Sequence, residues 1–117
     1  MKLRSLKFKS VKSTNDIALM FIKKNNIKPS IILSERQTKG RGTMGKKWIS
    51  KKGNLFLSIF FVMSKMKIDF KKFAIINAYL LRSIFAKKFS NKIKIKWPND
   101  LLFKKKKNLW NFTRDCY

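Results

Sequence analysis

The 4 glycines of this 117-residue chain all lie between Gly40 and Gly53, and 3 of them fall in one stretch, QTKGRGTMGKKW at 37–48. Glycine has no Cβ, so a loop rich in it can turn sharply and point successive backbone N–H groups at a ligand. Arg41, Lys46 and Lys47 add positive charge to the same loop. The stretch therefore predicts a binding site for an anion such as a phosphate.

The letters of Gly40 to Gly45 also match the dinucleotide-binding pattern G-x-G-x-x-G. In that pattern the loop opens a helix. Here residues 46–50 lead to Gly53 and then into an apolar, strand-like segment. The other well-known phosphate loop, G-x-x-x-x-G-K-[ST], does not occur in the chain. We therefore reject a Rossmann-type nucleotide site.

Composition narrows the class of protein. A length of 117 residues with 44% hydrophobic and 14% aromatic residues is typical of one small folded domain or a piece of one. The chain carries 30 Lys and Arg against 5 Asp and Glu, a formal net charge of +25. Two interpretations stay open: a basic surface for an acidic partner such as nucleic acid, or the lysine-rich composition of an A+T-rich genome. Histidine is absent, which excludes every mechanism that needs an imidazole.

We expect a cytoplasmic protein without a membrane partner. The single cysteine, Cys116, excludes an internal disulfide and favours a reducing compartment. The longest apolar run, 55–63, is too short to cross a bilayer. The N-terminal lysines are not followed by the apolar core of a secretory signal.

Hydrophobic periodicity and turn residues predict an α/β (α+β) fold. We expect strands over 1–9, 30–34, 54–62, 93–97 and 101–103, and helices over 14–26 and 69–89. Ser13-Thr14-Asn15 are expected to cap the first helix, with Asp16 in its first turn; binding of a polar ligand group by these three residues is the alternative. Pro98-Asn99-Asp100 is expected to turn the chain between the last two strands. The near-continuous apolar run of the 54–62 strand predicts burial on both of its faces. The second helix is expected to bury a stripe formed by Phe70, Phe73, Ala74, Asn77, Leu80, Leu81 and Ile84.

Three motifs together resemble the biotin protein ligases. Ser13-Thr14-Asn15, the loop around Gly40-Arg41-Gly42, and Lys96-Trp97-Pro98-Asn99-Asp100 occur in the order and rough spacing of the first half of that catalytic domain. The resemblance implies a mixed sheet with flanking helices, as in class II aminoacyl-tRNA synthetases, here incomplete. It also implies an enzyme that makes biotinyl-AMP from biotin and ATP and transfers biotin to a lysine of a biotin carboxyl carrier protein of acetyl-CoA carboxylase.

The resemblance also assigns roles to single residues. The implied biotin-binding residues are Ser13, Thr14, Asn15, Gln37, Arg41, Gly42, Thr43 and Lys107. The implied nucleotide-binding residues are Gly40, Gly42, Lys46, Trp48, Asn99 and Asp100. Arg41 and Lys107 would be catalytic, and Mg²⁺ is expected with ATP, without assigned ligands. Adenylation needs positioned N–H groups, cations and a metal ion, not a proton relay, so the absence of histidine is compatible with it.

The loop departs from the family at Thr43, Met44 and Lys46, where further arginines are usual. Lysine is a point charge without the planar fork of arginine, so we expect the adenylate to be held less firmly. The chain begins at the catalytic domain, and no DNA-binding domain is expected. A lipoate ligase relative, with the same fold and chemistry, and a small basic nucleic-acid-binding module remain alternatives.

We expect residues 1–107 to be the N-terminal part of the ligase domain and 108–117 to be an out-of-frame tail. Lys104 to Lys107 would be encoded by an A-rich run, where one base is easily gained. Reading 108–117 one base later with A+T-rich codons gives Ile-Cys-Gly-Ile-Leu-Gln-Glu-Ile-Val. That resembles the Lys-x-x-Gly-Ile-Leu-x-Glu strand of the family, with Lys107 as its ligand-contacting lysine. The chain is then expected to be an inactive, aggregation-prone fragment; a natural exposed tail is the alternative.

Overall fold

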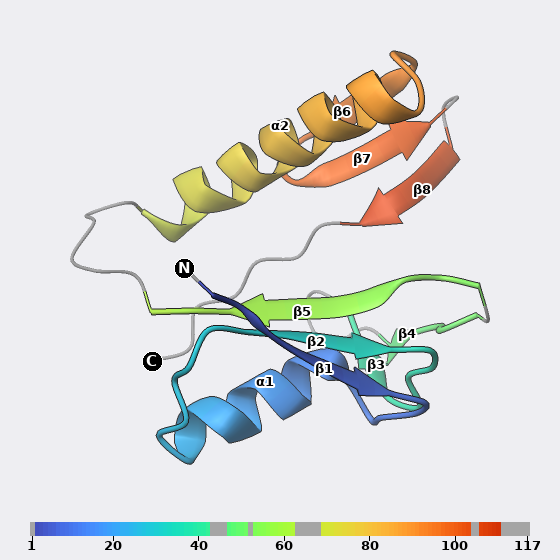
Figure 1. Ribbon diagram of the computed structural model, residues 1–117. Coiled ribbons are helices and arrows are strands. Elements are labelled where there is room, and N and C mark those ends of the chain that lie inside the picture. Colours follow the sequence, from blue (N-terminus) through green and yellow to red (C-terminus); the bar gives the residue numbers. More distant parts are fainter. Residues whose placement is uncertain (1, 43–46, 52, 63–68, 104–105, 111–117) are drawn as a thin grey trace. The chain divides into compact units, whose positions relative to one another are not determined.

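The computed structural model describes residues 2–42, 47–51, 53–62, 69–103 and 106–110 (Figure 1). The chain forms two compact units, Met1–Ser64 and Lys65–Tyr117. The elements of the first unit are β1 (Arg4–Phe8), α1 (Thr14–Lys23), β2 (Ser30–Ser34), β3 (Gly40–Arg41), β4 (Lys47–Trp48) and β5 (Phe56–Phe60). Those of the second are α2 (Phe70–Lys88), β6 (Ile93–Lys96), β7 (Asp100–Phe103) and β8 (Lys106–Trp110). The predicted α/β class is confirmed.

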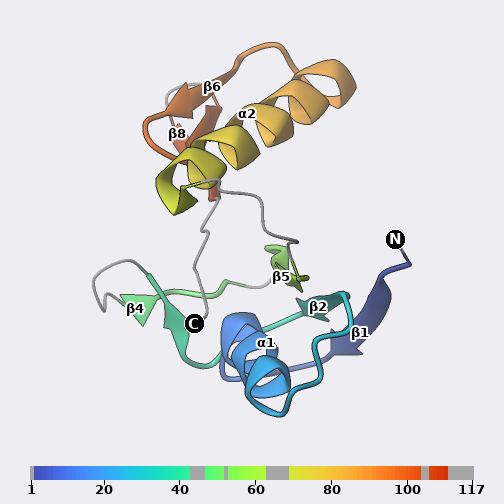
Figure 2. The ribbon, with the colours of Figure 1, turned by 90° about the vertical axis from the view of Figure 1, so that its left-hand side faces the viewer.

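The first unit is built on a mixed three-stranded sheet with the strand order β1-β2-β5. β1 and β2 run parallel, and α1 is the crossover between them. β5 pairs antiparallel with β2, so that Ile32 lies between Leu6 of β1 and Ser58 of β5. Figure 2 shows α1 on one side of this sheet. The predicted mixed sheet with a flanking helix is therefore present.

The core of the first unit lies between α1 and the sheet. Ala18, Ile32 and Phe60 are buried there. The ring of Phe21 stacks on that of Phe60, with 6.3 Å between the centroids. Burial of these side chains supplies the main favourable free energy for holding α1 in place.

The predicted strand at 54–62 is confirmed as β5, but the prediction that both faces are buried is wrong. Leu57 and Ile59 are 42% and 49% exposed. Successive side chains of a strand point to opposite faces, so Phe56 and Phe60 turn inward while Leu57 and Ile59 turn outward. A continuous apolar run hides this alternation, which is why the sequence pattern was misleading.

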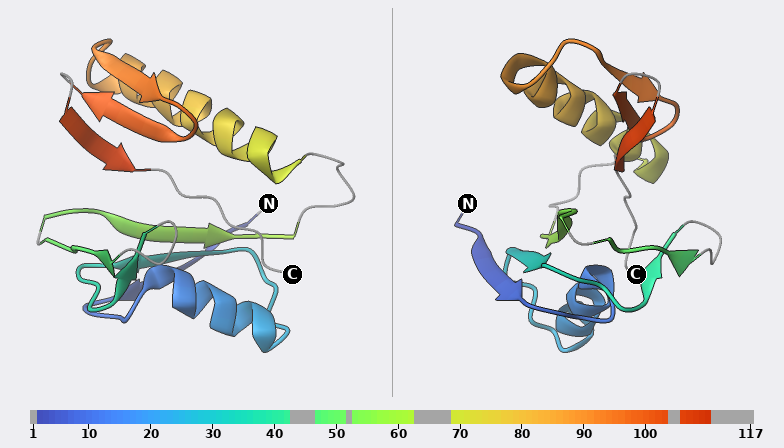
Figure 3. Two further views of the ribbon diagram at one scale, coloured as in Figure 1. Left: turned by 180° about the vertical axis from the view of Figure 1, so that it is seen from behind. Right: turned by 90° about the vertical axis from the view of Figure 1, so that its right-hand side faces the viewer.

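The second unit is an antiparallel sheet of order β6-β7-β8, with α2 packed against β6 and β7 (Figure 3). The turn predicted at 98–100 is present one residue earlier: residues 97–99 join β6 to β7, Asp100 already belongs to β7, and the Trp97–Pro98 peptide bond is cis. β8 runs to Trp110, and Leu109 and Trp110 pair with β7. The side chains of β8 and all of 111–117 lie outside the described residues. The proposed shift of frame after Lys107 stays a prediction.

The buried stripe predicted for α2 is partly wrong. Ala74 and Ala78 are buried, and Ile93 and Leu101 are buried on the sheet. Leu80 and Ile84 are 51% and 52% exposed, and the side chain of Phe70 lies outside the described part. Apolar residues occur around most of this helix, so periodicity alone does not select the face that meets the sheet. None of the helices in the described ranges combines the length and apolar character needed to span a membrane.

Candidate functional site

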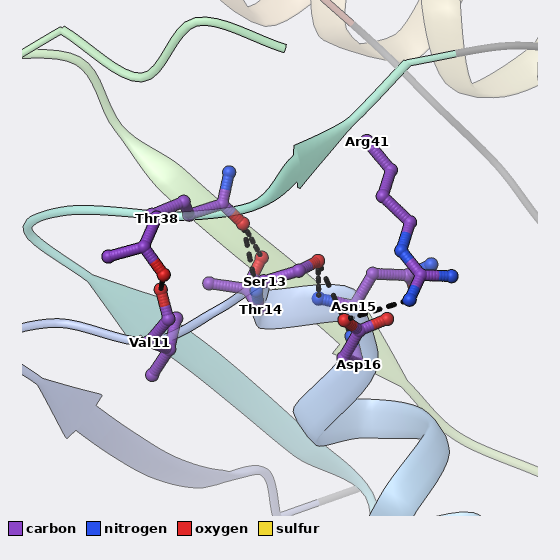
Figure 4. Close-up of polar contacts among 8 residues, drawn as sticks. Val11, Ser13, Thr14, Asn15, Asp16, Thr38 and Arg41 are labelled. Atoms are coloured by element: carbon purple, nitrogen blue, oxygen red, sulfur yellow. Dashed lines mark hydrogen bonds and ion pairs between the residues drawn. The ribbon is translucent and has the colours of Figure 1, made fainter. Parts of the chain in front are cut away.

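Ser13 caps the N-terminus of α1. Its backbone is extended, with φ −157° and ψ 136°, and its Oγ accepts hydrogen bonds from the backbone N–H groups of Asn15 (3.2 Å) and Asp16 (3.4 Å) (Figure 4). This is the preferred chemistry of a helix start, because the first N–H groups have no partner within the helix. The predicted capping role is thus confirmed for Ser13, which is buried.

Thr14, the first residue of α1, turns its polar groups toward Gln37. Its backbone N–H donates to Gln37 Oε1 at 2.8 Å, and its hydroxyl donates to the same oxygen at 3.2 Å. The hydroxyl of Ser58 donates to Thr14 Oγ1 at 2.9 Å. Thr14 is only 4% exposed. Three residues from α1, the β2–β3 loop and β5 therefore form one polar cluster at the start of the helix, called here the Thr14 cluster.

Gln37 reaches this cluster because the chain continues the parallel pairing of β1 and β2 beyond both strands. Val11 and Gln37 form an isolated parallel bridge. The backbone N–H of Thr38 donates to the carbonyl of Val11 at 2.9 Å, and that of Lys39 donates to the carbonyl of Lys12 at 2.8 Å. Figure 4 shows Thr38 against Val11 beside the start of α1. These backbone bonds fix residue 37 next to residue 14.

The glycine-rich stretch forms a β-hairpin rather than the start of a helix. Gly40 pairs with Trp48, and Arg41 pairs with Lys47. A Cβ on Gly40 would lie 2.9 Å from the backbone oxygen of Trp48, so this position requires glycine for close approach. Gly42 follows and is buried. The rejection of a Rossmann loop is confirmed, while Thr43 and Lys46 lie outside the described residues.

Arg41 brings positive charge from this hairpin to the first turn of α1. Its Nη2 lies 3.3 Å from Asp16 Oδ2, and its side chain is 59% exposed (Figure 4). The cap residue, the Thr14 cluster and a partly free cation are thus combined in the first unit. Such an arrangement can bind a small molecule that carries a polar head group and an anionic group.

The remaining candidate residues belong to β4 of the first unit and to the second unit. Trp48 is partly buried in β4. Asn99 and Asp100 belong to the second unit, at the β6–β7 turn, where Asp100 pairs with Lys96. Lys107 lies in β8 and pairs with Leu102 of β7. The side chain of Lys107 is outside the described part. Within the described ranges, no three His, Cys, Asp or Glu side chains come together as a metal site.

The sequence did not predict two features of this site: the part that Ser58 takes in it, and the ion pair of Asp16 with Arg41. Ser58 had a signal: it is a polar residue within the apolar run of 55–63, where an unpaired hydroxyl would be costly. Asp16 had been assigned only to the first turn of the helix. Its contact with Arg41 depends on the hairpin.

A known protein family matches most of the chain. The Biotin/lipoate A/B protein ligase family matches residues 7–108. The chain is 32% identical over 76 residues to the bifunctional ligase/repressor BirA of Escherichia coli K12, covering 64% of this chain and 24% of that protein. It is 31% identical over 70 residues to BirA of Salmonella typhimurium LT2, covering 59% and 22%.

Solved structures of ligases share the fold. The biotin protein ligase from Aquifex aeolicus in complex with biotin and ATP matches with a TM-score of 0.75 and 26% identity, over 89% of this chain and 43% of that one. The biotin acetyl coenzyme A carboxylase synthetase from Helicobacter pylori, with bound biotinylated ATP, matches with a TM-score of 0.74 and 26% identity, over 89% and 51%. The chain spans about half the length of these proteins or less.

Proposed function

This chain belongs to the biotin/lipoate A/B protein ligase family, and we propose that it is part of a ligase that attaches biotin to a protein. In the first step a carboxylate oxygen of biotin attacks the α-phosphorus of ATP. The bond from this phosphorus to the bridging oxygen breaks, and pyrophosphate leaves. In the second step a lysine amine attacks the acyl carbon of biotinyl-AMP, AMP leaves and the nitrogen loses a proton.

The observation that carries this proposal is the Thr14 cluster beside Arg41. The buried Thr14 hydroxyl and the half-buried Gln37 amide can bind the cyclic urea of biotin, which has both N–H donors and a carbonyl acceptor. Arg41, on the same side of the helix start, supplies charge for the carboxylate or the α-phosphate. Catalysis then depends on positioned donors and charge where negative charge develops.

We assign the remaining roles by family likeness. The biotin-binding set is Ser13, Thr14, Asn15, Gln37, Arg41, Gly42, Thr43 and Lys107, with Arg41 and Lys107 acting on the reacting groups. The nucleotide-binding set is Gly40, Gly42, Lys46, Trp48, Asn99 and Asp100. Mg²⁺ usually takes one or two carboxylates together with substrate phosphates, and the oxygens of Asn99 and Asp100 suit that limited role. When bound with ATP, Mg²⁺ neutralises charge on the phosphates.

Biotin fits this site better than lipoate. The head group of lipoate is a dithiolane ring, which offers no strong hydrogen-bond donor or acceptor. Binding it against the Thr14 cluster would leave the amide N–H groups of Gln37 desolvated and unpaired, at a cost of about 1–3 kcal/mol for each group. The acceptor in this proposal is a biotin carboxyl carrier protein in the cytoplasm, where ATP is available.

Ligand binding by the 117-residue chain tests the proposal. We expect biotin to raise the melting temperature, because it binds the native state, and lipoate to raise it much less. In a complete version of the enzyme, Arg41→Ala should abolish pyrophosphate release with biotin and ATP, while Lys7→Ala, a change of equal charge on β1, should leave it at the level of the unmodified enzyme. A melting temperature that responds to neither ligand, together with salt-sensitive binding to nucleic acid, would favour the basic nucleic-acid-binding module.

A further inference from the structure

Ser58 is the polar residue of β5, whose sequence is FLSIF. Strand alternation puts it on the same face as Phe56 and Phe60, which are both buried. An apolar residue would suit this face, since a hydroxyl removed from water costs free energy unless it is hydrogen-bonded. Ser58 is half-buried, and its hydroxyl donates to Thr14 Oγ1 at 2.9 Å.

The direction of every hydrogen bond in the Thr14 cluster follows from the donors available. The backbone N–H of Thr14 can only donate, so the Gln37 atom 2.8 Å away is the amide oxygen. The Thr14 hydroxyl lies 3.2 Å from that oxygen and donates its one proton to it. The proton between Ser58 and Thr14 therefore comes from Ser58. With its oxygen held by Thr14, the Gln37 amide keeps both of its N–H donors on the opposite side.

We propose that Ser58 is a positioning residue of the biotin site, acting through Thr14 on Gln37. Its donation to Thr14 Oγ1 holds the Thr14 hydroxyl toward Gln37 Oε1, and so adds to the bond from the Thr14 backbone N–H that orients the Gln37 amide. The role of Ser58 in ordering the cluster rests on the hydrogen-bond geometry alone. The identity of the ligand rests on the proposed function.

Removal of the Ser58 hydroxyl tests this role. In Ser58→Ala the buried oxygen of Thr14 loses its donor, and the Thr14 hydroxyl is free to rotate away from Gln37, whose amide oxygen then keeps only the bond from the Thr14 backbone N–H. We expect the Kd for biotin to rise about tenfold. Ser58→Thr keeps the hydroxyl and suits a strand, so its Kd should return to within about twofold of the unmodified chain. Ser58→Cys keeps the shape of the side chain but offers only a weak donor. It replaces Ser58→Ala in this test if that variant is too unstable to measure.

A double-mutant cycle with Thr14→Val shows whether Ser58 acts through Thr14. Valine keeps the volume of threonine without its hydroxyl. If the effect passes through Thr14, Ser58→Ala should raise the Kd by less than about twofold in the Thr14→Val background. Equal effects of Ser58→Ala in both backgrounds would overturn the inference.

Ser34→Ala is the matched control. Ser34 is a buried serine on the neighbouring β2, and its hydroxyl donates to the carbonyl of Arg36 rather than to the cluster. It should lower the melting temperature and leave the Kd for biotin unchanged. An equal loss of affinity in Ser34→Ala and Ser58→Ala would show a merely structural effect and overturn the proposal.

A ligand-free measurement separates this inference from the proposed function. The two side-chain N–H signals of Gln37 in the nitrogen-15 NMR spectrum should shift in Ser58→Ala and be restored in Ser58→Thr. If those signals respond as expected but the unmodified chain binds no biotin, the proposed function fails and the role of Ser58 in ordering the cluster stands. If biotin binds and neither the signals nor the Kd respond to Ser58→Ala, the role of Ser58 fails alone.

Discussion

The Arg41 guanidinium lies 3.3 Å from the Asp16 carboxylate, so an ion pair links the glycine-rich hairpin to the first turn of α1 (Figure 4). The Arg41 side chain is mostly exposed, and exposed ion pairs contribute only about 0–1 kcal/mol to stability. The pair therefore orients Arg41 near the Thr14 cluster without holding it firmly. An incoming carboxylate or phosphate can replace Asp16 at little cost.

Asp16→Asn is expected to strengthen binding of anionic ligands. The change removes the carboxylate that competes for Arg41 and a negative charge next to the site. We expect the Kd for biotin to fall about two- to fivefold at low salt, a gain that shrinks at high salt because the charges are exposed. Loss of a first-turn carboxylate should cost about 0.3–1 kcal/mol of stability.

Calorimetric titration at two salt concentrations measures the effect of Asp16→Asn. Glu35→Gln, which removes a negative charge from the end of β2, is the matched control and should leave the affinity near that of the unmodified chain. Weaker biotin binding by Asp16→Asn, or an equal gain in both variants, would contradict the competition between Asp16 and the ligand.

Gln37→Glu separates the structural role of Gln37 from its role toward the ligand. A glutamate oxygen can still accept both hydrogen bonds from Thr14, so the melting temperature should change by only a few degrees. The side chain loses its N–H donors and gains a charge, so we expect biotin affinity to fall more than tenfold. Gln37→Ala should lose both stability and affinity. Normal biotin binding by Gln37→Glu would mean that the amide N–H groups do not contact the ligand.

Gly40→Ala and Gly53→Ala are expected to differ in their effect on binding. The new Cβ at residue 40 would meet the backbone oxygen of Trp48 at 2.9 Å, which forces β3 and β4 apart and displaces Arg41. At Gly53 a Cβ meets nothing within 4 Å, but the φ of +91° is strained for alanine. Each change should cost about 1–3 kcal/mol of stability. Only Gly40→Ala should weaken biotin binding, as thermal melts with and without biotin will show.

Residues 108–117 are predicted to be read in a shifted frame. The family match ends at residue 108, one position after the predicted break at the lysine run 104–107. Independent sequencing of the gene should find a run that differs by one base in the A-rich codons of Lys104 to Lys107. Repeated reads with an unchanged run would contradict the prediction and leave the natural tail as the explanation.

The sequence by itself determined the local elements of this protein. The cap at Ser13 and the strand Ser30–Ser34 were predicted correctly, and the turn predicted at 98–100 was placed within one residue of the observed one at 97–99, since caps, alternation and turns depend on residues within a few positions of one another. The grouping of residues 13–15 with Gln37 came from family likeness, because no local pattern relates them. Their roles toward biotin and ATP stay predictions.

Only the tertiary structure decided which distant side chains meet. Ser58 lies 44 positions from Thr14 in the chain, and the pairing of β2 with β5 brings them together. The exposed outer face of β5 and the position of Arg41 beside Asp16 were decided in the same way. The physical reason is that strand register and helix packing set such contacts through backbone hydrogen bonds and burial summed over whole elements, and the residue types at the contact do not encode them.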